Sequence, residues 1–143
     1  MRYSAFICAA VLMAASTAVP SWAAEPVTTP VPAAVNSAVA DISTAELTKA
    51  IAAKQVTLLD CNGSQSFANG HIPGAIDFAT TSKELTAHLP KDKTALVVAY
   101  CGGPRCSSYK AATQAAQALG YTNVRHYSEG ISGWTKSGST VQK

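Results

Sequence analysis

Two cysteines stand five positions apart in the stretch "YCGGPRCSSYK", residues 100–110, directly after the apolar run "TALVVAY". Cys101 and Cys106 enclose two glycines, a proline and an arginine. Glycine allows backbone angles and close approaches that side chains forbid, and Pro104 stiffens the turn. Successive backbone N–H groups of such a loop can point into one concavity, and the positive end of a following helix adds to the same field. The pattern therefore predicts an anion cradle.

A sulfur at the centre of this cradle would be stabilised as a thiolate. We therefore expect the pKa of the Cys101 thiol to fall, which would make Cys101 a nucleophile near neutral pH. The alternative is that Cys101 is an ordinary buried cysteine at the end of a strand and that the glycines only form a turn. The spacing alone leaves both interpretations open.

Two other kinds of site fit the loop poorly. A structural zinc site needs a second pair of Cys or His ligands, and the three histidines are scattered along the chain, so we predict no metal. A phosphatase loop has arginine after a cysteine and five further residues. Here Ser107 stands at that position, and Arg105 comes two positions too early.

The first residues predict export. Arg2 precedes an apolar stretch, residues 5–19, and the small residues of "SWA" suit a signal peptidase. We expect a signal peptide, residues 1–23, and a periplasmic or secreted mature protein. An uncleaved anchor is the alternative, but the apolar stretch is short for a membrane span. We therefore expect no stable membrane insertion after cleavage.

The mature chain would carry little net charge and three cysteines. Loss of Arg2 leaves ten basic and eight acidic residues, which is too mild an excess to suggest nucleic acid or a charged membrane surface. Cys61, Cys101 and Cys106 remain in a compartment where disulfides persist. An odd number leaves at least one thiol unpaired within the chain.

Strands and helices are expected to alternate in the domain, residues 41–143. It follows a Pro/Ala-rich flexible linker, residues 24–40, which contains three prolines. Ser43 and Glu46 have the spacing of a capping box. The patterns predict helices at 43–53, 64–69, 82–89, 107–119 and from about 130, and strands at 56–60, 75–78, 94–100 and 123–127. This order favours an α/β domain with a mainly parallel central sheet.

Three segments in order resemble the rhodanese-like domains, also called thiosulfate sulfurtransferase domains. "LLDCNGSQSFANGHIPGAIDF" is similar to their first signature, and "VVAYCGGPRCSSYKAATQAAQALGYTNV" to their strand, active-site cysteine loop and helix. "YSEGISGW" resembles their closing Gly-Ile-x-x-Trp motif. The resemblance covers about residues 41–138 and implies the rhodanese-like fold, with helices on both faces of the sheet.

The resemblance implies a sulfurtransferase. Cys101 takes the family's catalytic position, with Asp60 and His71 in supporting places. A donor anion such as thiosulfate would leave a sulfur on Cys101 as a persulfide, and a thiol, a protein thiol or cyanide would accept it, with no cofactor or metal. The implied substrate-binding loop consists of Gly102, Gly103, Pro104, Arg105, Cys106 and Ser107.

The sequence departs from the family at two places. The common "DVR" reads "DCN" here, so Asp60 is retained and a local ion pair is expected to be lost. Arg105 is the loop's one arginine, and Cys106 stands where many relatives have another. The sequence therefore leaves open whether thiosulfate itself is turned over.

Cys106 has three possible roles. It could attack a Cys101 persulfide and leave a disulfide, pair with Cys61, or stay an unpaired thiol. Two alternative functions go with these roles: a thiol–disulfide redox protein that uses Cys101 and Cys106, or a non-catalytic binding module. Ser107 and Ser108 are expected to cap the following helix.

Overall fold

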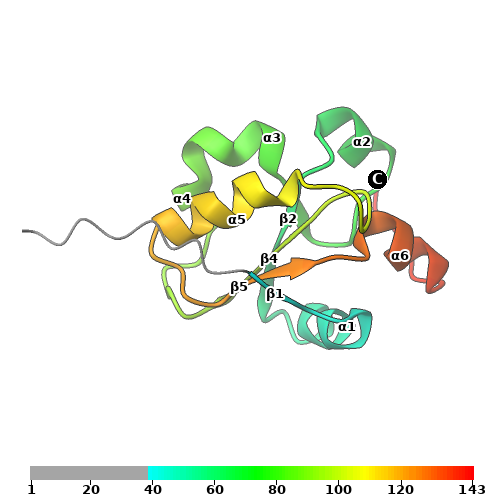
Figure 1. Cartoon of the computed structure of the whole chain (residues 1–143), viewed down its shortest axis with the longest axis horizontal. Helices are drawn as coiled ribbons and strands as arrows, with labels where there is room; N and C mark the ends of the chain where they lie inside the picture. The colour runs from blue at the N-terminus through cyan, green and yellow to red at the C-terminus, as the bar shows by residue number, and fades with distance from the viewer. Residues whose placement is uncertain (1–38) are drawn as a thin grey trace, which may run out of the picture. The chain divides into compact units, whose positions relative to one another are not determined.

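The computed structural model describes residues 39–143, and within them strands and helices alternate as the sequence predicts (Figure 1). The signal peptide and residues 24–38 of the linker lie outside the described residues and stay predictions. The strands are β1 (Ala40–Asp41), β2 (Val56–Asp60), β3 (Ala75–Asp77), β4 (Leu96–Tyr100) and β5 (Val124–Tyr127). The helices are α1 (Thr44–Ala52), α2 (Ser64–Asn69), α3 (Phe78–Thr81), η1 (Ser82–Glu84), α4 (Leu85–His88), α5 (Tyr109–Ala118) and α6 (Gly130–Lys136).

The five strands form one sheet in the order β1-β5-β4-β2-β3, and every pairing is parallel. This confirms the predicted parallel α/β architecture. β4 lies at the centre, between β5 and β2, so both of its edges are hydrogen-bonded. Its register places Tyr100 opposite Asp60 on one side and Tyr127 on the other. The chain leaves this central position directly into the cysteine loop.

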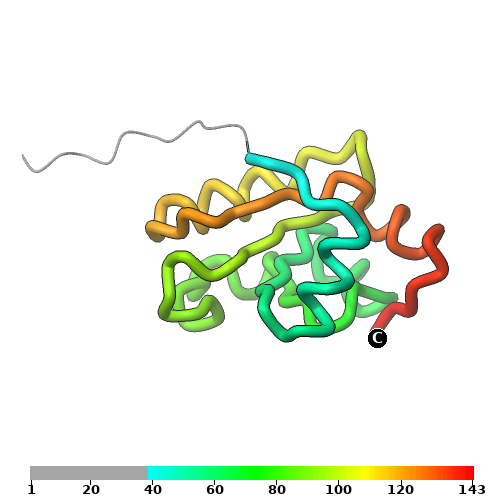
Figure 2. The backbone as a smooth tube through the Cα atoms, turned by 90° about the horizontal axis from the view of Figure 1, so that it is seen from below, coloured from blue at the N-terminus to red at the C-terminus, as the bar shows by residue number. Residues whose placement is uncertain are grey.

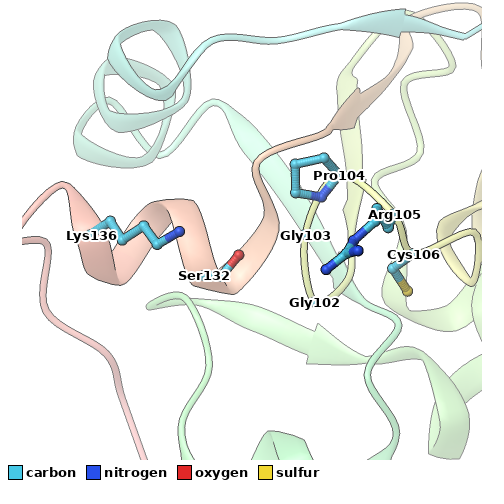
Figure 3. A pocket seen from close by; sticks show the side chains of 7 residues that line it. All are labelled: Gly102, Gly103, Pro104, Arg105, Cys106, Ser132 and Lys136. Atoms are coloured by element: carbon cyan, nitrogen blue, oxygen red, sulfur yellow. The ribbon is translucent and has the colours of Figure 1, made fainter.

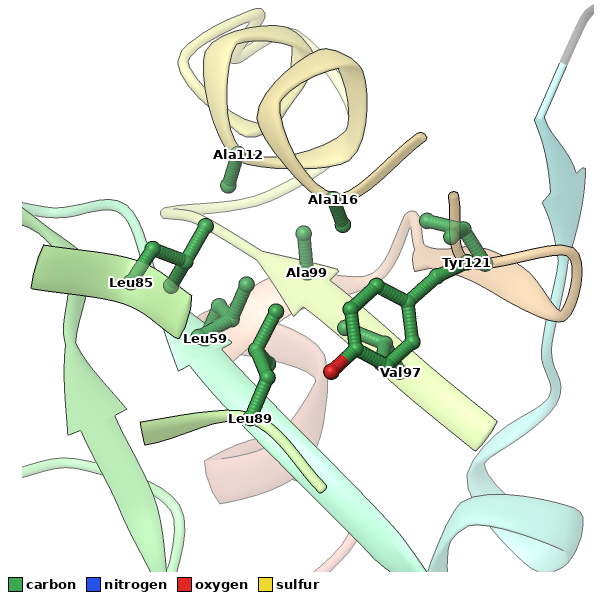
Figure 4. Close-up of a cluster of buried hydrophobic side chains, with 9 residues drawn as sticks. Leu59, Leu85, Leu89, Val97, Ala99, Ala112, Ala116 and Tyr121 are labelled. Atoms are coloured by element: carbon green, nitrogen blue, oxygen red, sulfur yellow. The ribbon is translucent and has the colours of Figure 1, made fainter. Parts of the chain in front are cut away.

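Helices cover both faces of the sheet with separate apolar clusters. On one face α4 and α5 pack over the strands, and Figure 4 shows Ala112 and Ala116 of α5 directed at the strand side chains. These alanines are fully buried, and their small size lets α5 lie close to Ala99 of β4. On the other face, side chains of α1 and α6 pack against the strands, with Leu47 and Trp134 as their buried members. A flat apolar run such as β4 suits a strand covered on both faces.

The predicted capping box is present at the start of α1. The Ser43 hydroxyl accepts the Glu46 N–H at 3.3 Å, and the Glu46 carboxylate accepts the Ser43 N–H at 3.1 Å. The helix predicted at 82–89 was placed too late. Helical structure begins at Phe78, because the Asp77 carboxylate accepts the Ala79 N–H at 2.9 Å at the end of β3.

Sequence analysis missed the edge strand β1. Ala40, which was assigned to the linker, and Asp41 pair with Arg125 and His126 of β5. Figure 2 shows this segment, at the cyan start of the described chain, running beside the orange β5. Two residues without alternating hydrophobicity give no strand signal. Among the described residues, no helix is long and apolar enough to cross a membrane.

Candidate active site

The cysteine loop begins where β4 ends, and α6 holds it from outside. The Ile131 N–H donates to the Cys101 carbonyl at 2.9 Å, and the Ser132 N–H donates to the Gly102 carbonyl at 3.2 Å. Gly130 has a φ of +58°, and a side chain there would collide with the Cys101 carbonyl and the Gly103 nitrogen. α6 therefore binds the Cys101 and Gly102 carbonyls, while the N–H groups of Gly102 and Gly103 face the sulfur atoms.

The loop N–H groups are divided between two sulfur atoms. Those of Gly103 and Tyr109 stabilise negative charge on Cys101. Those of Gly102 and Ser108 do the same for Cys106. The anion cradle predicted around one thiol therefore serves two.

The expectation that the pKa of the Cys101 thiol falls is wrong for this structure. Cys101 is 1% exposed, and this burial raises the pKa of its thiol. A hydrogen bond with Cys106 raises it further, against the lowering effect of the Tyr109 and Gly103 N–H groups. Burial penalises the charged form of a thiol, and here that penalty exceeds the stabilisation from the loop.

The lowered pKa belongs to Cys106 instead. Partial burial alone would raise the pKa of the Cys106 thiol. The hydrogen bond from the Cys101 thiol, together with the hydroxyl and N–H of Ser108, outweighs that burial and lowers the pKa to about 7. The Cys106 and Ser108 side chains lie 3.5 Å apart. Near neutral pH a large fraction of Cys106 is therefore a thiolate.

A cavity of about 380 Å³ opens over the loop, and its lining includes two basic side chains, those of Arg105 and Lys136. Figure 3 shows Arg105 and Lys136 reaching toward it from opposite sides, with Ser132 between them. Lys136 and Ser132 come from α6, and Cys106 also lines the cavity. Two cations at the rim of a cavity above hydrogen-bond donors would attract a small anion.

The comparisons with known proteins agree with this geometry. The family model of the rhodanese-like domain matches residues 43–137, which is more than half of the chain. The chain belongs to the rhodanese-like domain family. Its strand, cysteine loop, helix and closing motif all lie within the matched residues.

A relative and three solved structures illustrate how distant its neighbours are. An HTH-type transcriptional regulator of Mycobacterium tuberculosis is 32% identical over 103 residues, which are 71% of this chain but 44% of the regulator. The chain therefore spans less than half the length of this relative. A rhodanese-related protein from Thermoplasma volcanium has a TM-score of 0.57 at 23% identity, with 72% of this chain and 97% of that chain covered.

The other two structures carry sulfurtransferase names. The human single-domain sulfurtransferase has a TM-score of 0.53 at 24% identity, covering 69% of this chain and 97% of that chain. The thiosulfate sulfurtransferase of Pseudomonas aeruginosa has a TM-score of 0.57 at 23% identity, covering 73% of this chain and 20% of that chain. Identities this low establish the shared fold alone.

Cys61 of this rhodanese-like domain is not poised for reaction. Its side chain packs against the core cluster under α5, and its thiol donates to the Leu59 carbonyl over 3.8 Å. Burial, followed by the nearby Asp60 carboxylate, raises the pKa of the Cys61 thiol to about 12. All three cysteines of the described residues are free thiols, and it is Cys101 whose hydrogen bond lowers the pKa of Cys106.

Asp60 supports the loop indirectly. Its carboxylate accepts the Tyr100 hydroxyl at 2.6 Å, and it accepts both the N–H and the side-chain amide of Asn62 at 2.8 Å. The Tyr100 hydroxyl in turn accepts the Ile72 N–H at 3.0 Å. Asn62 lies against Gly102. Asp60 therefore joins the ends of β2 and β4 and holds Asn62, which lies against the loop at Gly102.

His71 has structural contacts. Its Nδ1 lies 2.9 Å from the Phe67 carbonyl, and its ring stacks on the Phe67 ring with centroids 3.7 Å apart. Its backbone also forms an antiparallel bridge with Gln142. These contacts hold α2 and the C-terminal segment in place and give His71 no contact with the cysteines. No cluster of three or more metal-binding side chains occurs among residues 39–143.

Sequence reasoning missed three residues at the site. Ser132 lies within the "GISGW" motif and Lys136 lies two residues after it, but only the packing of α6 on the loop brings them to the cavity. Ser108 was expected to cap α5, yet no side-chain capping bond forms, and its hydroxyl faces Cys106. A second cysteine in the loop was the signal that could have suggested this different partner.

Proposed function

We propose that this domain is a sulfurtransferase that carries a sulfane sulfur as a persulfide on Cys101. The observation that carries the proposal is that the carbonyls and the N–H groups around the loop have different partners. α6 takes the loop carbonyls, while the Gly103 and Tyr109 N–H groups stabilise negative charge on the Cys101 sulfur. A persulfide is more acidic than a thiol and is held as an anion by such donors. Family membership supports the same chemistry.

The first half-reaction moves one sulfur atom from the donor to Cys101. The Cys101 thiolate attacks the outer sulfur of thiosulfate, the sulfur–sulfur bond of the donor breaks, and sulfite leaves with the bonding electrons. Cys106 is the nearby base for the Cys101 proton, because its thiolate accepts the hydrogen bond from that thiol. A thiolate of higher pKa is scarcer but intrinsically more nucleophilic, so the raised pKa of Cys101 is compatible with attack.

The second half-reaction returns the sulfur to an acceptor. Cyanide or a small thiol attacks the outer persulfide sulfur, and the Cys101 thiolate is the leaving group. A protein thiol is a further candidate acceptor. The donor anion is expected to sit between Arg105 and Lys136, and the charge of Lys136 replaces the second loop arginine common in the family.

Thiocyanate formation from thiosulfate and cyanide tests the proposal. The reduced wild-type protein should form thiocyanate, and Cys101→Ser should abolish it. Cys61→Ala is the matched control, because it removes a partly buried cysteine that does not line the cavity, and it should retain activity. Wild-type protein that forms no thiocyanate and gains no sulfur on Cys101 from thiosulfate or from a low-molecular-weight persulfide would contradict the proposal and favour a binding module.

We also propose that the domain works in the periplasm or outside the cell. The support is the sequence of residues 1–23, with Arg2 before an apolar stretch and "SWA" at its end. Expression of the full chain in a bacterial host, followed by N-terminal sequencing of the periplasmic fraction, should give a protein that begins at Ala24. A protein that begins at Met1, or that stays with the membrane, would refute export by cleavage.

A further inference from the structure

We propose that Cys106 resolves the Cys101 persulfide, so that the domain releases the carried sulfur as sulfide and becomes a Cys101–Cys106 disulfide. The inference rests on the proposed function, since it begins from the persulfide. It adds a second outcome to sulfur transfer. A thiol of the same loop bonds to Cys101 and displaces the carried sulfur, and the protein then needs a dithiol reductant to return to its starting state.

The loop folds back on itself between the two cysteines. The Cys106 N–H donates to the Gly103 carbonyl at 3.0 Å, which closes a tight turn and returns the chain toward Cys101. The two thiols share a hydrogen bond, and each receives its own pair of loop N–H groups. The Cys106 sulfur therefore lies beside the Sγ atom of Cys101, which becomes the inner sulfur of the persulfide.

Cys106 is also in the right chemical form. Its pKa of about 7 makes it a thiolate in about half of the molecules at neutral pH. The thiolate is the species that attacks a disulfide or persulfide, and an attacking thiol whose pKa lies near the ambient pH reacts fastest. Ser108 stabilises this thiolate and is not used by a structural cap, which fits a role in the chemistry.

The step balances in atoms and electrons. The Cys106 thiolate attacks the inner sulfur of the persulfide, which is the Sγ atom of Cys101, and a Sγ–Sγ bond forms. The step uses the protonated fraction of the persulfide: the bond between Sγ and the outer sulfur breaks, and the outer sulfur leaves as hydrosulfide with its own proton and the bonding electrons. Cys106 is oxidised to the disulfide level, and the carried sulfur is reduced to sulfide. A dithiol reductant then supplies two electrons and two protons to restore both thiols.

Cys61 does not compete for this step. Its side chain is partly buried against the cluster under α5, and its pKa of about 12 leaves almost no thiolate near neutral pH. The disulfide itself would be open to reduction at one end. Cys106 lines the cavity, whereas Cys101 is almost fully buried, so a reductant from solvent would attack the Cys106 sulfur.

A single-turnover experiment under anaerobic conditions tests the inference. Full-length mature protein is reduced, freed of reductant and mixed with one equivalent of thiosulfate, with no acceptor. Sulfite and sulfide are followed to completion, and the cysteine peptides are identified by mass spectrometry. Wild-type protein should release about one equivalent each of sulfite and sulfide. Its Cys101 and Cys106 peptides should become linked with the loss of two hydrogens.

The variants separate this inference from the proposed function. Cys106→Ser should release sulfite more slowly, because it lacks the thiolate that takes the Cys101 proton. When followed to completion it should stop at a Cys101 persulfide, with the sulfide released per sulfite reduced at least about tenfold. Cys61→Ala should behave as the wild type. Protein kept without thiosulfate should retain three free thiols in the described domain, which excludes adventitious oxidation.

Each remaining outcome is decisive. Sulfite release from wild type with a lasting Cys101 persulfide and no sulfide would overturn resolution by Cys106 and leave the sulfurtransferase proposal standing. Sulfur found on Cys106 would mean that the outer sulfur was attacked, and would also overturn it. Loss of sulfide release in Cys61→Ala would assign the resolving role to Cys61. Absence of both sulfite and a sulfur adduct would count against the sulfurtransferase proposal itself.

Discussion

The Cα atom of Gly130 lies so close to the carbonyl of Cys101 that no side chain fits between them. This contact is the point at which α6 meets the cysteine loop, and the Ile131 N–H bonds the same carbonyl at 2.9 Å. The backbone of Gly130 is also in the left-handed region, at φ +58°. The closing motif of the chain therefore acts as a clamp on the loop.

Gly130→Ala should loosen this clamp. A Cβ atom in the left-handed region costs about 1 to 2 kcal/mol, and overpacking against the loop adds about 1 to 3 kcal/mol. We expect the free energy of unfolding to fall by about 2 to 5 kcal/mol. Displacement of the loop should also slow sulfite release from thiosulfate. Urea unfolding and single-turnover sulfite release measure the two effects.

Gly138→Ala is the matched control for this substitution. Gly138 has a φ of +78°, and a Cβ atom there would meet no other atom within 4 Å. The free energy of unfolding of this variant should fall only by about 1 to 2 kcal/mol, which is what a Cβ atom in the left-handed region costs. The variant should release sulfite at the wild-type rate. Equal losses in the two variants would show that contact with Cys101 does not matter.

Local chemistry explains which parts of the fold the sequence revealed. The capping box of Ser43 and Glu46, the apolar run of β4 and the alanine-rich α5 were predicted correctly, because each depends on residues close in the chain. β1 was missed because two residues carry no periodicity, and its pairing partner lies on β5. The helical segment begins at Phe78, earlier than predicted, because Asp77 at the end of β3 caps it.

The site was less predictable than the fold. Sequence spacing located both loop cysteines, but it assigned the lowered pKa to Cys101. Burial and the hydrogen bonds that each sulfur receives within the folded loop decide which sulfur carries charge, and spacing does not show them. Lys136 was missed for a similar reason. It lies far along the chain from the loop, and α6 brings it to the cavity.

Lys136→Ala should weaken the binding of an anionic donor. Loss of one cation beside a small anion near the protein surface is worth about 1 kcal/mol, so the KM for thiosulfate should rise about fivefold with kcat little changed. The difference should shrink at high ionic strength, since salt screens exposed charges. Steady-state thiocyanate formation at low and high salt measures it.

Lys91→Ala is the control for the lost charge. Lys91 is exposed and precedes β4, so it lies toward the opposite end of that strand from the loop. Its loss should leave the KM for thiosulfate within about twofold of wild type. An unchanged KM in Lys136→Ala, or an equal rise in both variants, would contradict the role of Lys136 in the cavity.

The reactivity of Cys106 should titrate near neutral pH. Partial burial raises the pKa of Cys106, but the Cys101 thiol and Ser108 lower it to about 7. The rate of its alkylation by iodoacetamide should therefore rise with pH and reach half its maximum at about pH 7, while Cys61 stays unreactive. Mass spectrometry of the cysteine peptides at a series of pH values gives both rates.

The partner thiol can be tested in the same experiment. Cys101→Ala removes the hydrogen bond that stabilises the Cys106 thiolate, so the midpoint for Cys106 should move to higher pH. Ser108→Ala should move it in the same direction, because it removes the hydroxyl whose hydrogen bond with Cys106 lowers the pKa of that thiol. A midpoint that stays the same in both variants would show that neither group sets the acidity of Cys106.

His126 should make the stability of the fold depend on pH. The residue is 6% exposed, and its ring stacks on Tyr109 with centroids 3.4 Å apart. Its Nδ1 lies 3.0 Å from the Asp41 carboxylate, and its buried Nε2 has no hydrogen-bond partner among the described residues. Burial lowers the pKa of His126 below 6.5, although Asp41 opposes the shift. Protonation would place an unpaired N–H donor beneath α5.

The sign of the effect follows from this lowered pKa. The unfolded chain takes up the proton at a higher pH than the folded chain, so the contribution of His126 to stability is complete above pH 6.5 and is lost as the pH falls through the folded pKa. His126→Phe keeps a flat ring for Tyr109 to stack on and removes the titration. The Asp41 side chain is 61% exposed, so its carboxylate stays hydrated in the variant.

Urea unfolding at about pH 8 and about pH 5 measures the contribution of His126. Other groups titrate over the same range, so the informative quantity is the difference between the wild type and His126→Phe. The wild type should lose more of its free energy of unfolding on acidification than the variant does. Equal losses, or a greater loss in the variant, would mean that His126 is not held neutral in the folded domain, and that the stack on Tyr109 tolerates a charged ring.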